Sequence, residues 1–409
     1  MTTATAQGYD PLDPIVQADP YAYYAELRRH APVHYVDSLG AYVVSRHADV
    51  RNMLHDAATF TNEAMAALVA RPADFAVDGG GQQEPFTGSI IGMDGEEHAR
   101  LRKIVSRGFT PRRIAALEHE MRATVGQYVD RLREHGTGDL QAELAVPFPI
   151  IVIATMLGVD PALRDEFRRW SEHMVLAVFE PGAGERADEI ARSNQQMGDW
   201  LDSVIVERDR RDGDDLISVL LRAELDGGAL TRDELRVFVV TLLVAGSITT
   251  AYLIGNAVLT LVTAPELLAR AQGDQDRALV ASIVDESLRH DTPTQMMFRT
   301  VSRETMVAGS TLPAGATAVA LLGSANRDES VFADPDAFVP ERANRDVVAF
   351  GHGAHYCLGA ALARLEARVA IEELLARSAG IELAGQVDRV GSLVFNGPTR
   401  LPIALTPMH

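Results

Sequence analysis

The chain has very little cysteine and no excess of basic residues. Cys357 is the only cysteine in 409 residues, which excludes an internal disulfide framework and is typical of a reducing cytoplasm. The formal net charge of −19 argues against general binding to nucleic acid or to an anionic membrane surface. The segment from Met1 to Asp13 has no basic stretch followed by an apolar one, so no signal peptide is expected. These absences predict a cytoplasmic protein.

Repeats, low-complexity tracts and clear linkers are also missing, and a single domain over residues 1–409 is predicted. The run from Val237 to Pro265 carries no charged residue and is long enough to cross a membrane. No second span exists, and neither flank carries a basic cluster. Polar residues and glycines interrupt the run: Thr241, Gly246, Ser247, Thr249, Thr250, Gly255 and Asn256. The pattern therefore predicts a long helix buried in the middle of a soluble protein, without membrane contact.

Helical periodicity dominates the chain between Gly95 and Arg289. Two short β-prone runs, Val33 to Val36 and Ala41 to Ser45, are joined by four residues that include a glycine, which predicts a hairpin. Strand-like pieces return at Ala316 to Leu322 and at Val390 to Thr406. The sequence therefore predicts a mainly α fold with a small β portion.

The cysteine lies in a glycine-rich loop, Phe350-Gly351-His352-Gly353-Ala354-His355-Tyr356-Cys357-Leu358-Gly359, followed by a helical pattern from Ala360 to Arg377. The start of a helix offers unpaired N–H groups and the positive end of the helix dipole, which favour a thiolate over a thiol. The sulfur is therefore suited to act as a metal ligand or a nucleophile. Two alternatives are a small buried apolar cysteine and a catalytic nucleophile, for which no protease-like pattern surrounds Cys357.

Loop, thiolate and helix together resemble the haem-ligand loop of cytochromes P450. The resemblance runs from about Asp19 to Pro407, and it implies haem b as cofactor, with Cys357 as axial ligand of the iron and Phe350 and Gly351 in the haem-binding loop. It also implies the cytochrome P450 fold, in which the haem lies between a long central helix and the cysteine-loop helix.

Further motifs occur in the order typical of this family. His98 and Arg102, four residues apart on one helix face, correspond to the pair that binds a haem propionate; without the resemblance they would be solvated surface residues. Arg299 corresponds to the arginine of the other propionate, a role that His355 is expected to share. Glu286, Arg289 and Arg342 correspond to a structural triad that supports folding and haem retention.

The segment Ala245-Gly246-Ser247-Ile248-Thr249-Thr250 resembles the family's oxygen-activating motif, and it departs from that motif at one position. The resemblance implies catalytic roles for Gly246, Thr249 and Thr250 above the haem. The family places an acid where this chain has Ile248, and an isoleucine cannot carry or relay a proton. The departure leaves three explanations open: Thr249, Ser247 and water suffice, the substrate supplies its own polar group, or the reaction is not ordinary hydroxylation.

The resemblance implies a monooxygenase that activates dioxygen to oxidise, and above all to hydroxylate, a lipophilic small molecule or natural product of secondary metabolism. Oxidative carbon–carbon coupling or ring closure, peroxide use and a non-catalytic haem sensor are the alternatives. No flavin or nicotinamide domain is present, so electrons are expected from a ferredoxin and its reductase, docking near a basic cluster, with the chain acting as a monomer. The cluster comprises Arg100, Arg102, Lys103, Arg107, Arg112 and Arg113.

The resemblance also predicts the lining of a mainly apolar substrate pocket, with the segment from Met65 to Ile91 as its lid. The predicted lining residues are Thr241, Val244, Ala245, Gln295, Met296, Val394 and Phe395.

Overall fold

The computed structural model of the chain describes residues 4–69, 88–179, 187–209, 213–223, 228–274 and 277–407. It divides into two compact units. The first unit combines Met1–Asn62, Glu118–Ala145 and Thr249–His409, and the second combines Glu63–Leu117 and Val146–Ile248. Residues 70–87, which make up most of the predicted lid, lie outside the described residues.

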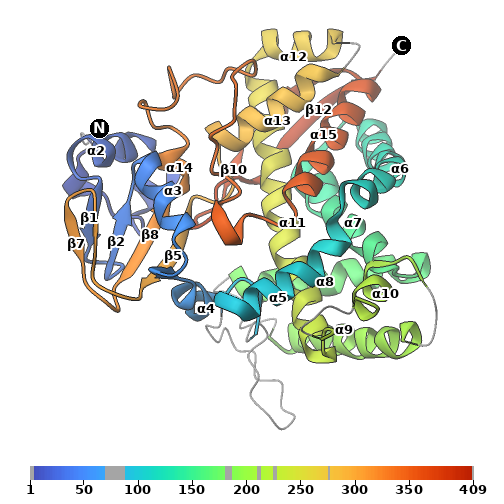
Figure 1. Cartoon of the computed structure of the whole chain (residues 1–409). Coiled ribbons are helices and arrows are strands. Elements are labelled where there is room, and N and C mark those ends of the chain that lie inside the picture. The colour runs from blue at the N-terminus through green and yellow to red at the C-terminus, as the bar shows by residue number, and fades with distance from the viewer. Residues whose placement is uncertain are drawn as a thin grey trace. The chain divides into compact units, whose positions relative to one another are not determined.

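The first unit contains a five-stranded sheet with the strand order β1-β2-β8-β5-β3, of which Figure 1 labels β1, β2, β8 and β5. The strands β1 (Val33–Val36) and β2 (Ala41–Val44) form the predicted antiparallel hairpin, with Val33 opposite Val44. The other pairings are parallel between β2 and β8 and antiparallel between β8 and β5 and between β5 and β3. The remaining strands of this sheet are β3 (Phe60–Thr61), β5 (Met296–Val301) and β8 (Thr317–Leu321).

Both faces of this sheet are covered by apolar side chains because successive strand residues point to opposite sides. In β8, Val319 and Leu321 join a core cluster that includes Leu27 of α2 (Tyr21–His30). Ala318 and Ala320 join a second cluster that includes Met53 of α3 (His47–His55). The same alternation decides which side chains of β5 share a face of the sheet.

The first unit is otherwise mainly helical. Its helices include α13 (Ala278–His290) and α15 (Ala360–Arg377), which pack against each other. The cysteine-loop helix therefore has the bounds that the sequence predicts. The other elements are η1 (Ala6–Gly8), α1 (Pro14–Ala18), β4 (Thr137–Asp139), the π-helical η3 (Gln141–Ala145), α12 (Pro265–Gly273), β6 (Thr305–Val307), β7 (Ser310–Leu312), α14 (Leu322–Ala325), η6 (Gly353–His355), β9 (Ser378–Leu383), β10 (Asp388–Arg389), β11 (Pro398–Arg400) and β12 (Pro402–Pro407).

The second unit is built from helices throughout its described part, as the sequence predicts. They are α4 (Glu63–Val69), α5 (Gly95–Val105), η2 (Ser106–Phe109), α7 (Pro147–Leu157), η4 (Pro161–Leu163), α8 (Arg164–Phe179), α9 (Ala187–Arg208) and α10 (Leu216–Leu221). Two further helices have residues in both units: α6 (Pro111–His135) and α11 (Arg232–Thr263).

Helix α11 is the long apolar helix that the sequence predicts between Val237 and Pro265. It is long and apolar enough to cross a membrane, and 61% of its most apolar window is buried inside the structure. Burial of this kind is typical of a core helix in a water-soluble protein. The predicted small β portion is also present, so the expectation of a mainly α fold with some sheet is confirmed.

Candidate active site around the cysteine loop

A tight backbone loop holds Cys357 just before helix α15. The N–H of Cys357 donates to the carbonyl of Phe350 over 2.9 Å, and the N–H of Gly351 donates to Val348 over 2.9 Å. The Cys357 side chain is exposed, and the residue precedes the first residue of α15 by three positions. The sulfur therefore lies near the positive end of a helix dipole, where a thiolate is favoured.

Two glycines of this loop meet requirements that other residues satisfy poorly. Gly351 and Gly353 have φ angles of 72° and 74°, in the region that disfavours a Cβ atom. A Cβ on Gly353 would lie 2.8 Å from the carbonyl oxygen of Leu54 at the end of α3. The loop therefore depends on both glycines for its conformation, and on Gly353 also for its contact with α3.

Two predicted cofactor-binding residues lie in the same unit as the loop. His355 follows Gly353 by two residues, and its Nε2 lies 2.7 Å from Nδ2 of Asn62. Arg299 is 3% exposed, and its Nη1 donates to the carbonyl of Phe298. A Cβ on Gly351 would lie 3.8 Å from the sulfur of Met297. Because Met297 and Arg299 are two residues apart in β5, they share the strand face that approaches the loop.

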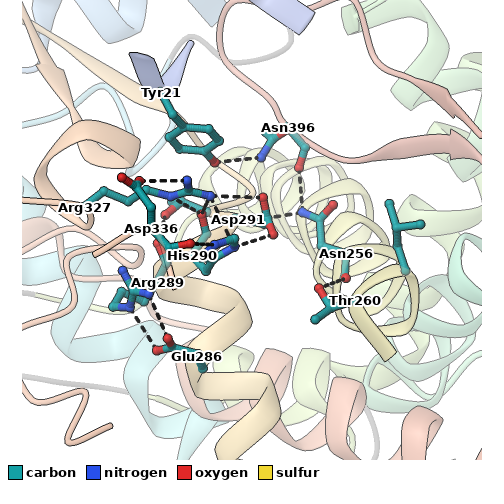
Figure 2. Close-up of polar contacts among 12 residues, drawn as sticks. Tyr21, Asn256, Thr260, Glu286, Arg289, His290, Asp291, Arg327, Asp336 and Asn396 are labelled. Atoms are coloured by element: carbon teal, nitrogen blue, oxygen red, sulfur yellow. Dashed lines mark hydrogen bonds and ion pairs between the residues drawn. The ribbon is translucent and has the colours of Figure 1, made fainter. Parts of the chain in front are cut away.

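The three residues of the predicted structural triad are in direct contact. Glu286 and Arg289 are both 0% exposed, and Arg289 donates from Nη2 and Nε to the two Glu286 oxygens over 2.7 and 2.9 Å (Figure 2). Arg342 donates from Nε to Oε1 of Glu286 over 3.3 Å. Burial acts to raise the pKa of Glu286, but Arg289, the Val339 N–H and the Asn344 side chain hold that pKa below its usual value.

The second unit contains the predicted pair His98 and Arg102, one turn apart on α5. His98 is 4% exposed, and burial, together with the charge of Arg102, lowers the pKa of its imidazole. A neutral imidazole still has one N–H donor, whereas Arg102 keeps its charge. The pair therefore offers one neutral donor and one cation.

The segment that carries the predicted oxygen-activating residues is helical throughout. Within the second unit, a Cβ on Gly246 would lie 3.1 Å from Cδ1 of Ile153 on α7. The missing side chain is thus needed for close helix packing, whatever else the glycine does. Thr249 and Thr250 follow on the same helix in the first unit, and Thr250 is 3% exposed.

The predicted pocket residues of the second unit lie on α11. The hydroxyl of Thr241 donates to the carbonyl of Val237 over 2.7 Å and lies 3.0 Å from the hydroxyl of Ser89. If Thr241 gives its proton to Val237, Ser89 must donate to Thr241, and the hydroxyl pair is then occupied within the protein. Val244 and Ala245 continue the same helix.

The predicted pocket residues of the first unit come from two segments that are joined by backbone hydrogen bonds. Gln295 donates from its N–H to the carbonyl of Val394 over 2.7 Å, and Phe395 forms a β-bridge with Thr294. The side-chain amide of Gln295 donates to the carbonyl of Thr292 over 2.7 Å. Met296 lies in the core cluster on the α2 side of the sheet. Met297, which sequence reasoning did not select, lies on the face that approaches the cysteine loop.

Sequence reasoning also did not select Glu366 of α15. Its side chain is 2% exposed, and it hydrogen-bonds to Thr250. A signal was present in the sequence, because Glu366 lies at i, i+4, i+7 spacing between Leu362 and Val369, on the apolar stripe of the helix.

Comparison with known proteins identifies the family. The family model described as "Cytochrome P450" matches residues 41–378. The erythromycin C-12 hydroxylase of Saccharopolyspora erythraea is 39% identical over 86% of this chain and 85% of its own length. The structure of cytochrome P450 CYP109Q5 from Chondromyces apiculatus matches with a TM-score of 0.88 at 40% identity, covering 98% of both chains. The testosterone complex of CYP109E1 from Bacillus megaterium matches with a TM-score of 0.83 at 29% identity, covering 95% of this chain and 99% of that one.

The donor residues of the first unit fit the cofactor of this family. An exposed cysteine at the start of a helix suits a soft axial ligand to iron. Arg299, near the same loop, suits the carboxylates of a porphyrin. The solved structures confirm the predicted fold. Members of this family act on small molecules with electrons from a redox partner. The chain therefore belongs to the cytochrome P450 family and is a haem-thiolate monooxygenase that binds haem b.

Proposed function

We propose that this enzyme hydroxylates a lipophilic natural product, with electrons delivered by a ferredoxin and its reductase, as a monomer in the cytoplasm. The observation that carries the proposal is the cysteine loop, in which an exposed thiol is held at the start of α15 beside the face of β5 that carries Arg299. The apolar helix α11, with Gly246 and Thr249 in the family's order, supports oxygen activation over simple haem binding.

We assign the cofactor contacts as follows. Cys357 would ligate the haem iron through its thiolate, and the backbone of Phe350 and Gly351 would contact the porphyrin. By the family resemblance, Arg299 and His355 would hold one propionate and His98 and Arg102 would hold the other, because partly buried carboxylates require cations or strong donors. When bound, haem b supplies the activation of dioxygen and the oxidation of the C–H bond, promoted by the electron-rich thiolate.

The protein has to position the substrate, keep bulk water away and deliver protons. Thr249 has a hydroxyl that both accepts and donates a hydrogen bond, so it is suited to organise proton delivery. We infer that Thr241, Val244 and Ala245 line one part of the substrate site, and that Val394 and Phe395 line another. Gln295 contributes through its backbone N–H, which donates to Val394, and Met296 contributes from the sheet core, since the side chains of both are packed within the protein.

The ferredoxin assignment rests on charge. Within the basic cluster, Arg100 pairs with Glu234, and Arg113 donates to the carbonyl of Asp214. Lys103, Arg107 and Arg112 are exposed, and an acidic partner would be attracted to them although the chain as a whole carries a net charge of −19. Opposite charges at such a surface chiefly increase the association rate, and salt weakens the effect.

The substrate class is inferred from the apolar lining and from the relatives. One relative is named for hydroxylation of erythromycin, and another was solved with testosterone, so testosterone serves as a defined probe. Ile248 favours a second candidate, oxidative coupling or peroxide use, because a reaction with less need for external protons tolerates the loss of the acid. A haem sensor would bind ligands without consuming NADH.

The test begins with the ferrous–carbon monoxide difference spectrum of the purified protein. The red-shifted Soret band of a thiolate-ligated haem is expected, and Cys357→Ser is expected to remove it. A variant that kept the band would disprove the ligand assignment. NADH consumption with ferredoxin, its reductase and testosterone, giving a hydroxylated steroid, supports hydroxylation. Ligand-induced spectral shifts without NADH consumption would instead indicate a sensor.

A further inference from the structure

Met297 carries a thioether at the base of the cysteine loop, and the proposed roles above assign it no task. It is half-buried, and it lies on the face of β5 opposite to that of its neighbour Met296. A Cβ on Gly351 would lie 3.8 Å from the sulfur of Met297 and 3.9 Å from its methyl carbon. The thioether end of the side chain therefore lies against the loop backbone.

The same side chain packs against the apolar cluster that supports the loop. This cluster includes Val348 and Leu54. The carbonyl of Val348 accepts the N–H of Gly351 over 2.9 Å, and the carbonyl of Leu54 lies 2.8 Å from the position of a Cβ on Gly353. Met297 thus belongs to the packing that holds the loop between the sheet and α3. A change in the polarity of its side chain acts directly on that packing.

Oxidation is the reaction that produces such a change. Hydrogen peroxide converts the flexible apolar side chain of methionine into a polar sulfoxide. The N–H of Gly351 is already bonded to Val348, so it is not free to donate to the new oxygen. The sulfoxide oxygen either stays in the apolar cluster without a partner, which is unfavourable, or turns to solvent and withdraws the side chain from Gly351. Both outcomes weaken the support of the loop.

The proposed reaction supplies the oxidant. When two electrons and two protons reach dioxygen without oxidation of the substrate, the product is hydrogen peroxide. Ile248 stands where the family has an acid, and it cannot relay a proton. We therefore expect part of the turnover to release hydrogen peroxide inside the protein that carries Met297.

We propose that Met297 is an oxidation site through which hydrogen peroxide from uncoupled turnover loosens the cysteine loop and limits further turnover. This inference rests on the proposed monooxygenation for the source of the peroxide. A lone pair of the Met297 sulfur attacks one peroxide oxygen, the O–O bond breaks, and the other oxygen leaves as water. The sulfur loses two electrons, and the peroxide gains them. A methionine sulfoxide reductase returns two electrons from thiols and releases the oxygen as water.

The competing explanation is that Met297 only fills space. Leucine has a similar volume and no sulfur, so Met297→Leu keeps the packing and removes the oxidation site. Met297→Gln places a polar group at the same position without any oxidation. Met306 is the matched control for exposure, because it lies on β6 in the same unit and is 71% exposed. Met296 is the control for burial, at 2% exposed.

The first measurement is mass-spectrometric peptide mapping of the holoenzyme after treatment with hydrogen peroxide. Met306 and Met297 are each expected to gain one oxygen atom at peroxide concentrations that leave Met296 unmodified. Turnover with NADH, ferredoxin and its reductase is expected to oxidise Met297 without added peroxide, and catalase should prevent this. A wild type in which Met306 is oxidised while Met297 stays unmodified would overturn the proposal.

The second measurement is the rate of haem transfer from the enzyme to an excess of apomyoglobin. Oxidation of the wild type is expected to raise this rate about tenfold, the factor for one buried polar group without a partner. Met297→Leu should keep the untreated rate after peroxide treatment, and Met306→Leu should respond as the wild type does. Met297→Gln should show the raised rate without peroxide. Methionine sulfoxide reductase with dithiothreitol should restore the wild-type rate, which separates this effect from irreversible damage to the haem.

The outcomes are separable. Equal acceleration in the wild type and in Met297→Leu would show that Met297 does not control the loop, and it would overturn the proposal. If Met297→Leu fails to fold, reduction of the wild-type sulfoxide decides, and a transfer rate that stays high after Met297 has been reduced would also overturn it. A wild type that consumes no NADH with any probe would instead contradict the proposed function, while added peroxide still tests the oxidation site.

Discussion

Glu286 and Glu366 are two glutamates of the same unit, each withdrawn from solvent, in opposite electrostatic surroundings. Glu286, 0% exposed, accepts hydrogen bonds from Arg289, from Arg342 and from the N–H of Val339. Glu366, 2% exposed, has the hydroxyl of Thr250. The pKa of Glu286 is lowered although burial acts to raise it, and the pKa of Glu366 is raised because burial dominates there.

The difference shows that burial alone does not decide whether a carboxyl group is charged. A carboxylate surrounded by guanidinium groups is fixed in its charged form and serves as a structural link between α13 and the segment that carries Arg342 (Figure 2 shows the Arg289 part of this link). Burial without a cationic partner raises the pKa of a carboxyl and so favours its neutral form. Removing each group should therefore affect a different property of the enzyme.

The largest expected effect is on stability, at Glu286. Glu286→Gln leaves the guanidinium of Arg289 buried without its counter-ion, and we expect a loss of about 3–5 kcal/mol in the free energy of unfolding. Near pH 4.3, where the unfolded chain also keeps much of its Glu366 proton, Glu366→Gln exchanges one neutral hydrogen bond for another and should change stability by about 1 kcal/mol or less. Guanidinium denaturation of the two holoenzymes, followed by circular dichroism, checks this contrast. Equal losses in the two variants would contradict it.

A smaller effect is expected at the rim of the same triad. Arg342 is partly exposed and donates to Glu286 over 3.3 Å and to the carbonyl of Asp334 over 3.1 Å. Arg342→Ala removes hydrogen bonds to a charged group, while Arg289 still compensates Glu286, so a loss of about 1.5–3 kcal/mol is expected. Exposed Arg345 is the matched control, and its replacement by alanine should change stability by about 0.5 kcal/mol or less. A loss at Arg342 as small as at Arg345 would remove it from the triad.

Part of the fold could be predicted from the sequence. The fold class, the hairpin of β1 and β2 and the bounds of α15 followed from local patterns, because hydrophobic periodicity and turn residues act over a few positions. Strand β4 was not predicted within the helical region, since it forms by pairing with β12, far away in the chain. The sequence around β4 carries no information about this distant pairing partner.

Only part of the candidate site could be predicted, again because the sequence shows local patterns but not distant contacts. The glycine-rich loop encodes its own geometry, with Gly351 and Gly353 at positive φ, so Cys357 was identified from the sequence. Glu366 was not, because a charged residue in a helix is ordinarily assigned to the surface. Its position on the stripe of Leu362 and Val369 was the only local indication. That no charged side chain among the described residues shifts its pKa became visible only in three dimensions.

The smallest expected effect, counted per pH unit, is the pH dependence of the free energy of unfolding at Glu366. Because its pKa is raised on folding, the native protein keeps a proton that the unfolded chain releases. The stability from this group is complete below the unfolded glutamate pKa of about 4.3 and falls by about 1.4 kcal/mol per pH unit above it, up to the folded pKa. Glutamine does not titrate, so Glu366→Gln should gain on the wild type by that amount per unit as the pH rises. Free energies of unfolding measured at several pH values between 5 and 8 test this, and parallel curves would mean that the pKa of Glu366 is the same in the native and the unfolded protein.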